Sequence, residues 1–160
     1  QLSYTSYGHN VEFAWLLLHA ADVLGVPRDN YSEVVRPIFD HCVEFGIDGE
    51  YGGVFVEGPW DASPTLTEKQ FWQQAEALVG LLDGCLLLGD EKYWTAFRNV
   101  YDFVFEKFIN MSAGGEWYER LDREGQPIDD ALGHAWKISY HTVRSMVQTT
   151  KRLEALAERA

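Results

Sequence analysis

The chain repeats a pattern of residues at an interval of 64 positions. Four pairs carry the repeat: Leu24-Gly25 with Leu88-Gly89, Glu12 with Glu76 and Trp72 with Trp136 at 64 residues, and Gly52-Gly53 with Gly114-Gly115 at 62 residues. Self-similarity at a fixed interval of this order is typical of repeat proteins. In such proteins each unit leaves an apolar face uncovered until a neighbouring unit packs against it. The repeat therefore predicts an array or ring of similar units.

Each unit is predicted to hold two helices and their connectors. Five stretches have helical apolar periodicity, at about residues 8–24, 30–46, 68–88, 91–109 and 134–158. The signals at their ends are Gly25 and Gly89 at two C-termini, and Asn30 with Glu33 and Thr67 with Gln70 as N-terminal capping boxes. The two Gly-rich stretches, residues 52–58 and 114–125, are expected to be short hairpins or extended loops.

Five helices correspond to about two and a half units. We therefore expect an all-α fold of one domain over residues 1–160 that forms part of a closed ring of helix pairs, an α/α toroid. A partial ring exposes a broad apolar edge, because its end units lack neighbours. The sequence thus predicts a partner that completes the ring, either a second copy in a homodimer or a complementing half.

The composition excludes two classes of partner. The 160 residues carry a formal net charge of −12, from 25 acidic and 13 basic side chains, without the basic cluster that a nucleic-acid binder needs. No apolar run approaches the ~18 residues that cross a bilayer. Cys42 and Cys85 lie in apolar helical stretches without metal-ligand spacing, which is typical of reduced thiols. These features favour a cytoplasmic protein that binds neither nucleic acid nor membranes.

Three predicted helix starts carry clusters of polar and aromatic residues. The clusters are Tyr7-Gly8-His9-Asn10-Val11-Glu12, Phe71-Trp72-Gln73-Gln74-Ala75-Glu76 and Trp136-Lys137-Ile138-Ser139-Tyr140-His141. In a toroid the N-terminal ends of successive inner helices line one end of the central cavity. The backbone N–H groups there favour a developing negative charge. The repeat therefore predicts that the three clusters share one site.

Two interpretations remain open for the individual residues. His9 and Glu12 are three apart, so the carboxylate either fixes the tautomer of the imidazole or simply forms a surface pair with it. No further ligands accompany this pair at metal-binding spacing, and we predict no metal site. A lone His141 in an apolar stretch is usually a core residue. Trp72 and Trp136 offer flat faces suited to stacking on sugars, although core packing explains them equally well.

Together the motifs resemble those of a known family. In order they are Ser6–Glu12 with Trp15-Leu16-Leu17, Lys69–Glu76, Gly115–Tyr118 and Trp136–Arg144. They are similar to the motifs of the cellobiose 2-epimerase branch of the N-acylglucosamine 2-epimerase superfamily, over nearly the whole chain. The resemblance implies an (α/α)6 barrel of which this chain supplies roughly the C-terminal half, and cofactor-free proton transfer at C2 of a reducing mono- or disaccharide.

The resemblance also implies roles for individual residues. His9, His141 and Glu12 match the family's catalytic residues, and the substrate-binding candidates are Trp72, Trp136, Glu76 and Tyr7. The sequence departs from the family at three positions, Asn10, Phe71 and Ser139. A third histidine and an arginine of the family site belong to the N-terminal half of the barrel. The activity of this chain is therefore expected to depend on that half.

The resemblance implies a reaction through an enediolate. We expect His141 to remove the C2 proton and His9 to return a proton to the opposite face of the carbon. One alternative is an aldose–ketose isomerase, which protonates the same enediolate at C1. A second is an inverting glycoside hydrolase that uses Glu12 and Glu76. A third is a half-barrel without activity that binds sugar or only associates with a partner.

Overall fold

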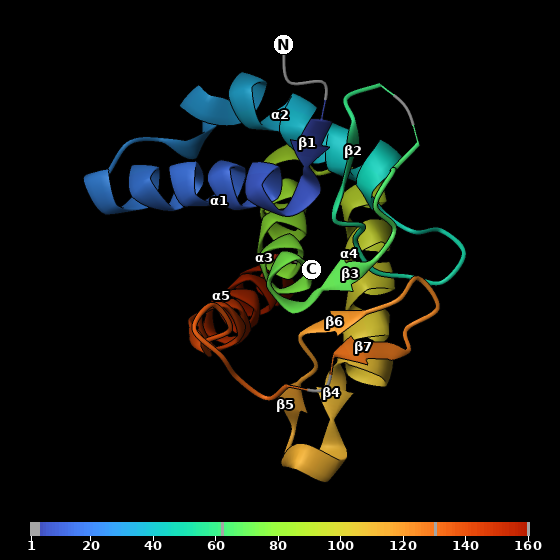
Figure 1. The fold of residues 1–160 in the computed structure, drawn as a ribbon. Coiled ribbons are helices and arrows are strands. Elements are labelled where there is room, and N and C mark those ends of the chain that lie inside the picture. The colour runs from blue at the N-terminus through green and yellow to red at the C-terminus, as the bar shows by residue number, and fades with distance from the viewer. Residues whose placement is uncertain (1–3, 62, 130, 160) are drawn as a thin grey trace.

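The computed structural model describes residues 4–61, 63–129 and 131–159 (Figure 1). The helices are α1 (Tyr7–Leu24), α2 (Ser32–His41), α3 (Phe71–Leu88), α4 (Glu91–Phe103) and α5 (Tyr140–Ala157). Short strands connect them, and the described helices do not close into a barrel. The predicted fold class, a partial toroid of about five helices with short hairpins, is confirmed.

The short elements link the helices at one end of the fold. Strand β1 (Tyr4–Ser6) pairs antiparallel with β2 (Glu57–Pro59), and β4 (Ile109–Asn110) pairs with β5 (Glu116–Trp117). A third sheet has the antiparallel order β3 (Lys69–Gln70), β6 (Arg120–Leu121), β7 (Pro127–Asp129). The remaining turns are 3-10 helices at Arg28–Tyr31 and Met111–Ala113 and π-helices at Cys42–Gly46 and Val104–Phe108.

The first two units repeat at the level of the backbone. Helices α1 and α3 start and end 64 residues apart, and each is followed by a left-handed glycine, Gly25 (φ 67°) and Gly89 (φ 69°). Helices α2 and α4 both run into a π-helical turn, and these turns are 62 residues apart. The two glycines satisfy helix-end carbonyls in a conformation that other residues adopt only with strain.

The third unit departs from the repeat. Helix α5 starts at Tyr140, five residues later than the 64-residue interval places it, so the predicted helix start at residue 134 is wrong. Trp72 therefore corresponds to His141 in the helices, and Trp136 precedes the helix. The cause is buried Lys137, whose Nζ donates to the carbonyls of Leu132 (2.7 Å) and Trp117 (2.6 Å) and holds the backbone outside a helix.

Both predicted capping boxes are also wrong. Asn30 lies in a 3-10 turn, and α2 begins at Ser32 after Tyr31, whose side chain makes no capping bond. Helix α3 begins after Gln70, again without a side-chain cap. Its first N–H, on Phe71, donates instead to the carbonyl of Glu119 at 3.0 Å. A backbone carbonyl just before β6 thus takes the place of a local cap.

Helix α3 lies at the centre of the fold, packed between α1, α4 and α5. Every residue from Gln73 to Gly84 is buried, so α3 lacks the polar stripe of a surface helix. A Cβ at Gly80 would lie 2.2 Å from Cγ1 of Val11, which means that α1 and α3 cross with closely spaced backbones. This position requires glycine.

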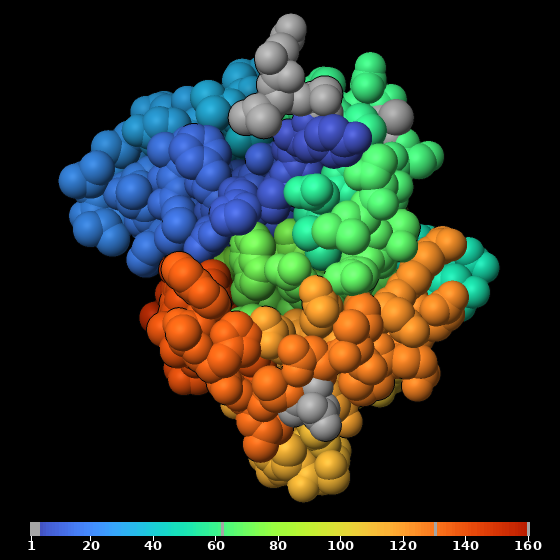
Figure 2. Space-filling model, in the orientation of Figure 1, coloured from blue at the N-terminus to red at the C-terminus, as the bar shows by residue number. Residues whose placement is uncertain are grey.

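Apolar side chains stay exposed on α1 and α5, which both pack against α3. Figure 2 shows α1 uncovered along one face of the molecule. The exposed apolar residues of α1 are Phe13, Leu16, Val23 and Leu24, and those of α5 include Val143 and Val147. Among the described residues, no helix is long and apolar enough to cross a membrane. The predicted association with a partner stays a prediction.

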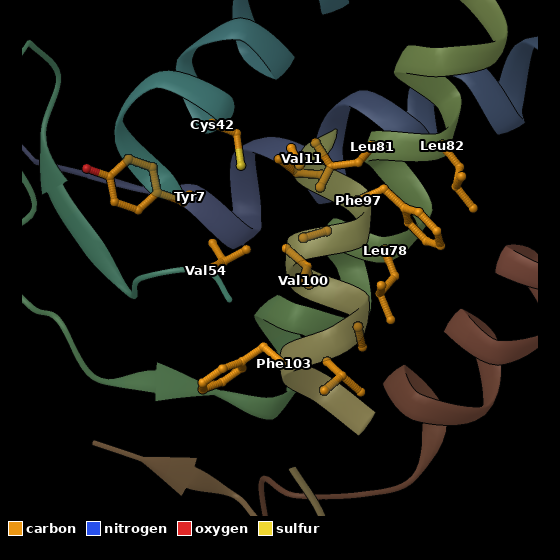
Figure 3. Packing of buried hydrophobic residues seen from close by; sticks show 14 of the residues in the cluster. Tyr7, Val11, Cys42, Val54, Leu78, Leu81, Leu82, Phe97, Val100 and Phe103 are labelled. Atoms are coloured by element: carbon orange, nitrogen blue, oxygen red, sulfur yellow. The ribbon is translucent and has the colours of Figure 1, made fainter. Parts of the chain in front are cut away.

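The hydrophobic core is formed by buried side chains of α1, α2, α3 and α4 (Figure 3). Its fully buried aliphatic side chains include Leu78, Leu81 and Leu82 of α3, which face Phe97 and neighbouring residues of α4. Burial of each such side chain contributes about 1.5–3 kcal/mol. This core fixes α3, and with it the polar residues at its N-terminal end.

A buried ion pair fixes the strand that leads into α3. Nζ of Lys69 donates to Oδ2 of Asp48 (3.0 Å) and to the carbonyl of Arg123 (2.6 Å), and neither Lys69 nor Asp48 is more than 1% exposed. Burial alone would raise the pKa of Asp48. Hydrogen bonds from the Arg123 side chain, from Lys69 and from the amides of Glu50 and Tyr51 lower this pKa to about 2. The carboxylate thus stabilises the folded state.

We expect this pair to make the stability of the fold sensitive to acid. The pKa of Asp48 is depressed, so its contribution is present above the unfolded pKa of ~3.9 and is lost as the pH falls through about 2. The loss is about 2 kcal/mol, measured as the free energy of unfolding in denaturant between pH 4 and pH 2. In Asp48→Asn the acid-induced loss should be smaller by this amount. Asp102→Asn, at an exposed pair with Arg98, is the matched control and should keep it. An equal loss in Asp48→Asn and wild type would contradict the assignment.

Candidate active site

A pocket of about 630 Å³ opens where the N-terminal ends of α1, α3 and α5 converge. In Figure 2 the surfaces of these three segments, blue, green and orange, meet in the middle of the face shown. The residues that line the pocket are His9, Glu12, Gln70, Phe71, Trp72, Glu119, Ala135, Trp136, Ile138, Tyr140 and His141. Of the seven predicted site residues, five line this pocket: His9, Glu12, Trp72, Trp136 and His141.

A buried carboxylate behind the pocket links the three inner helices. Glu76 is 0% exposed, and its Oε2 accepts from the indole N–H of Trp15 on α1 at 2.7 Å. Its Oε1 accepts from Nη2 of Arg144 (2.7 Å) and pairs with Nδ1 of His141 (2.5 Å), both on α5. Because both oxygens accept bonds and one bond comes from a guanidinium, Glu76 is a carboxylate anion here.

These partners assign the tautomer of His141. Since Glu76 only accepts, Nδ1 of His141 carries a proton and donates it to Oε1. In the neutral ring Nε2 then has a free lone pair. The side chain of His141 is 11% exposed and lines the pocket. The lone pair is available to accept a proton from a molecule bound there, and the carboxylate behind the ring fixes the orientation of the imidazole.

His9 has a different partner. Its Nδ1 lies 2.9 Å from Oγ of Ser6, and that oxygen accepts from Nε2 of Gln73 (3.3 Å) and from the His9 backbone N–H (3.4 Å). No hydrogen bond joins His9 to Glu12 among the described residues, so the predicted orientation of His9 by Glu12 is wrong. Glu12 instead bonds to Arg144: Nη2 of Arg144 donates to Oε1 of Glu12 at 2.7 Å.

Arg144 lies between two carboxylates and two aromatic rings. One nitrogen, Nη2, serves both Glu12 and Glu76, and the guanidinium lies 4.9 Å from the Trp15 ring and 5.2 Å from the Tyr140 ring. Burial lowers the pKa of Arg144, but the hydrogen bonds to the two carboxylates outweigh burial and raise it. The cation is therefore present at every physiological pH.

Trp72 lies against both histidines. The centroid of its ring is 4.6 Å from that of His9 and 5.6 Å from that of His141. Its indole N–H donates to Oε1 of Gln70 at 2.8 Å, which fixes the orientation of the ring. Trp72 therefore adds a flat ring to the pocket lining next to both imidazoles.

Trp136 lies on the segment that precedes α5 and is 88% exposed. Its backbone N–H donates to Nδ1 of His134 at 3.1 Å, and Nε2 of His134 pairs with Oε2 of Glu119 at 2.6 Å. Together with the buried Lys137, these bonds hold the segment before α5 at the pocket. The indole of Trp136 is free to contact a bound molecule.

Two predicted substrate-binding residues lie outside the lining. Tyr7 is fully buried, with its ring 5.5 Å from that of His41 and its hydroxyl directed at Gly58, so it belongs to the core. Glu76 is behind His141 and does not reach the pocket wall. Sequence reasoning assigned no site role to Arg144, although it follows His141 by three residues on one helical face.

Three groups at the site have donor atoms close enough for a metal ion. Glu12, Glu76 and His141 each offer one atom, and these atoms lie within 4.8 Å of one another. The guanidinium of Arg144 already bonds to both carboxylates, and Nδ1 of His141 carries a proton. A cation would have to displace Arg144, so these residues do not fit a metal.

The sequence of this chain is similar to those of known sugar epimerases and isomerases. The family model described as N-acylglucosamine 2-epimerase (GlcNAc 2-epimerase) matches residues 3–145. The chain is 29% identical over 147 residues to a cellobiose 2-epimerase of Eubacterium cellulosolvens, covering 92% of this chain and 36% of that protein. It is 27% identical over 146 residues to a D-mannose isomerase of Marinomonas mediterranea, covering 91% and 36%.

A solved structure has the same arrangement of helices. The cellobiose 2-epimerase from Spirochaeta thermophila superposes with a TM-score of 0.83 at 27% identity, covering 96% of this chain and 39% of that chain. The chain thus spans less than two fifths of the length of these relatives, and the part that it matches is their C-terminal half.

The indole of Trp15 offers a test of the carboxylate link. Trp15→Phe keeps an aromatic ring in the core but removes one donor from buried Glu76, so the free energy of unfolding should fall by about 1.5–3 kcal/mol. Trp94→Phe is the matched control, because Trp94 is 39% exposed and stacks on Phe97, and it should cost less than about 0.5 kcal/mol. Equal losses in the two variants would mean that the Trp15–Glu76 bond does not stabilise the fold.

Proposed function

This chain belongs to the N-acylglucosamine 2-epimerase family, and on that premise we propose that it supplies half of the catalytic cavity of a carbohydrate 2-epimerase. The substrate is a reducing mono- or disaccharide, and the reaction needs no cofactor. Residues 1–160 form one domain, the C-terminal half of an (α/α)6 barrel. The barrel is completed by an N-terminal half or by a second copy of this chain.

One observation carries the proposal: His141, backed by a buried carboxylate, lines the pocket with no hydrogen bond to Nε2 from the described residues, and a second histidine, His9, lines the same pocket against Trp72. Epimerisation at C2 removes a proton from one face of the carbon and returns a proton to the other. It therefore needs two acid–base groups that flank one position. Imidazoles with a pKa near ~6.5 in water serve in either direction near neutral pH.

The reaction begins with opening of the sugar ring. The C2 hydrogen becomes acidic only when C1 is an aldehyde, because the resulting anion spreads onto the oxygen as an enediolate. His141 takes the C2 proton on Nε2, and Glu76 stabilises the imidazolium that forms. The enediolate then takes a proton on its other face. Backbone N–H groups at the helix starts stabilise its negative charge.

The partners of the two histidines support this division of roles. His141 is hydrogen-bonded to the carboxylate of Glu76, which stabilises the imidazolium formed on proton uptake, whereas His9 is hydrogen-bonded to the neutral hydroxyl of Ser6. Glu12 acts indirectly, because its carboxylate accepts a hydrogen bond from Arg144 and holds that side chain in place. The flat faces of Trp72 and Trp136 stack on the C–H faces of the sugar.

A ketose-forming isomerase is the second candidate. The same enediolate gives the ketose if the proton returns to C1 in place of C2. Similarity to a D-mannose isomerase of Marinomonas mediterranea supports this alternative. The product separates the two: a 2-epimer supports the first function and a ketose the second.

The site geometry disfavours glycoside hydrolysis. An inverting hydrolase needs its two carboxyl groups about 6.5–9.5 Å apart, with room for a water molecule between them and the sugar. The nearest oxygens of Glu12 and Glu76 lie within 4.8 Å, and Arg144 bonds to both. Glu76 is also fully buried.

Activity is to be measured on the closed ring, by which we mean this chain together with the partner that completes the barrel. During turnover of cellobiose, N-acetylglucosamine or D-mannose in D₂O, deuterium should appear at C2 of recovered sugar, measured by NMR. His141→Ala and His9→Ala should each lower the rate by on the order of 10²–10⁴. His19→Ala is the matched control, since His19 is on α1 but outside the pocket. Product without deuterium at C2 after many turnovers would refute the scheme, and His→Ala losses below tenfold would reassign those residues.

A further inference from the structure

We propose that Arg144 is a positioning residue that keeps Nε2 of His141 unprotonated. Its positive charge compensates the buried carboxylate of Glu76, which would otherwise be neutralised by an added proton. The catalytic meaning of this role rests on the proposed function. The geometric basis is the sharing of one oxygen: Oε1 of Glu76 accepts from both Nδ1 of His141 and Nη2 of Arg144.

A buried carboxylate needs a compensating charge. Glu76 is fully buried, and an uncompensated carboxylate in such a place takes up a proton from its surroundings. The nearest sites for that proton are Glu76 itself and His141. If the proton stays on Glu76, it donates to Nδ1 and the imidazole hydrogen moves to Nε2. If it goes to the ring, the result is an imidazolium. Both outcomes protonate Nε2 and remove the base from the pocket.

Arg144 prevents this because its charge is already in place. The charged or titratable groups that face His141 are His9 and Glu12 from α1, Glu76 from α3, Arg144 and Tyr140 from α5, and Glu119 from the pocket lining. Among these described groups, Arg144 is the permanent cation and the one that bonds to Glu76 together with His141. It neutralises one of the two carboxylates it bonds, so the Glu76–His141 pair does not need a second proton.

The surroundings of Arg144 fix the guanidinium where this role requires it. Two aromatic rings hold its plane, those of Trp15 and Tyr140, and Glu12 accepts from the same nitrogen that bonds to Glu76. Glu12 thereby holds Arg144 in place. This bond accounts for the position of the Glu12 carboxylate, which is near His9 without bonding to it. Tyr140 and Trp72 flank the His141 ring, at 3.8 and 5.6 Å between centroids, and limit the access of water to it.

Substitutions of Arg144 can separate the effect of its charge from the effect of its hydrogen bonds. Arg144→Gln keeps donors near Glu76 but removes the charge, so Nε2 of His141 should become protonated at neutral pH. Arg144→Lys keeps the charge and should leave Nε2 unprotonated. Arg144→Met gives a second neutral side chain if the Gln variant does not fold. Arg98→Met removes a cation from the exposed pair with Asp102 and is the matched control.

The measurement is the ¹⁵N chemical shift of Nε2 in His141 of the full chain, by long-range ¹H–¹⁵N correlation NMR at pH 7. The inference expects a lone-pair nitrogen in wild type, Arg144→Lys and Arg98→Met, and a protonated nitrogen in the neutral Arg144 variants. An unprotonated Nε2 in Arg144→Gln or Arg144→Met would overturn it. Protonation in Arg144→Lys as well would also overturn it, because charge would then not be the cause.

Kinetics of the closed ring provide the second readout. In Arg144→Gln the acidic limb of kcat/KM against pH should move to higher pH, with Arg144→Lys restoring it, whereas a purely structural role would lower the rate without moving the limb. Protonation of Nε2 in Arg144→Gln, together with a wild-type ring that leaves C2 unlabelled in D₂O, would refute the proposed function alone. Labelling at C2 with no NMR response would refute the role of Arg144 alone.

Discussion

The buried charge of Glu76 is the constraint on which the rest of the site depends. This carboxylate is in the N-terminal part of α3, with no exposed surface, and it accepts bonds from Trp15 of α1 and from His141 and Arg144 of α5. Removing one partner of such a buried pair typically costs 3–5 kcal/mol, because it leaves a charge uncompensated. Three helices are therefore held together by the group that also sets the tautomer of the candidate base. Stability and chemistry share one side chain.

The repeat predicted much of the fold because it reflects packing that recurs. The 64-residue interval matches the ends of α1 and α3 and brings His9 and Trp72 to one pocket. It failed for the third unit, where it paired Trp72 with Trp136. Buried Lys137 there bonds to the carbonyl of Trp117, 20 residues away in the chain, and local periodicity carries no information about such a bond.

The identity of the site residues was more predictable than their roles. His9, His141, Trp72 and Trp136 line the pocket as expected, but Glu12 orients Arg144 and not His9. The spacing of three residues between His9 and Glu12 permits contact without requiring it. The stronger attraction of the carboxylate to a guanidinium 132 residues away decides the outcome. Helical spacing shows which residues share a face, whereas charge across helices decides which of them pair.

A double-mutant cycle between Glu76 and Arg144 tests the central claim most directly. The free energies of unfolding of Glu76→Gln, Arg144→Gln and the double variant are compared with that of the wild type. If the buried charge joins α3 to α5, the double variant should be less destabilised than the sum of the single variants by about 1.5–3 kcal/mol. Additivity within about 0.5 kcal/mol would contradict the claim, since Glu76 and Arg144 would then not depend on each other.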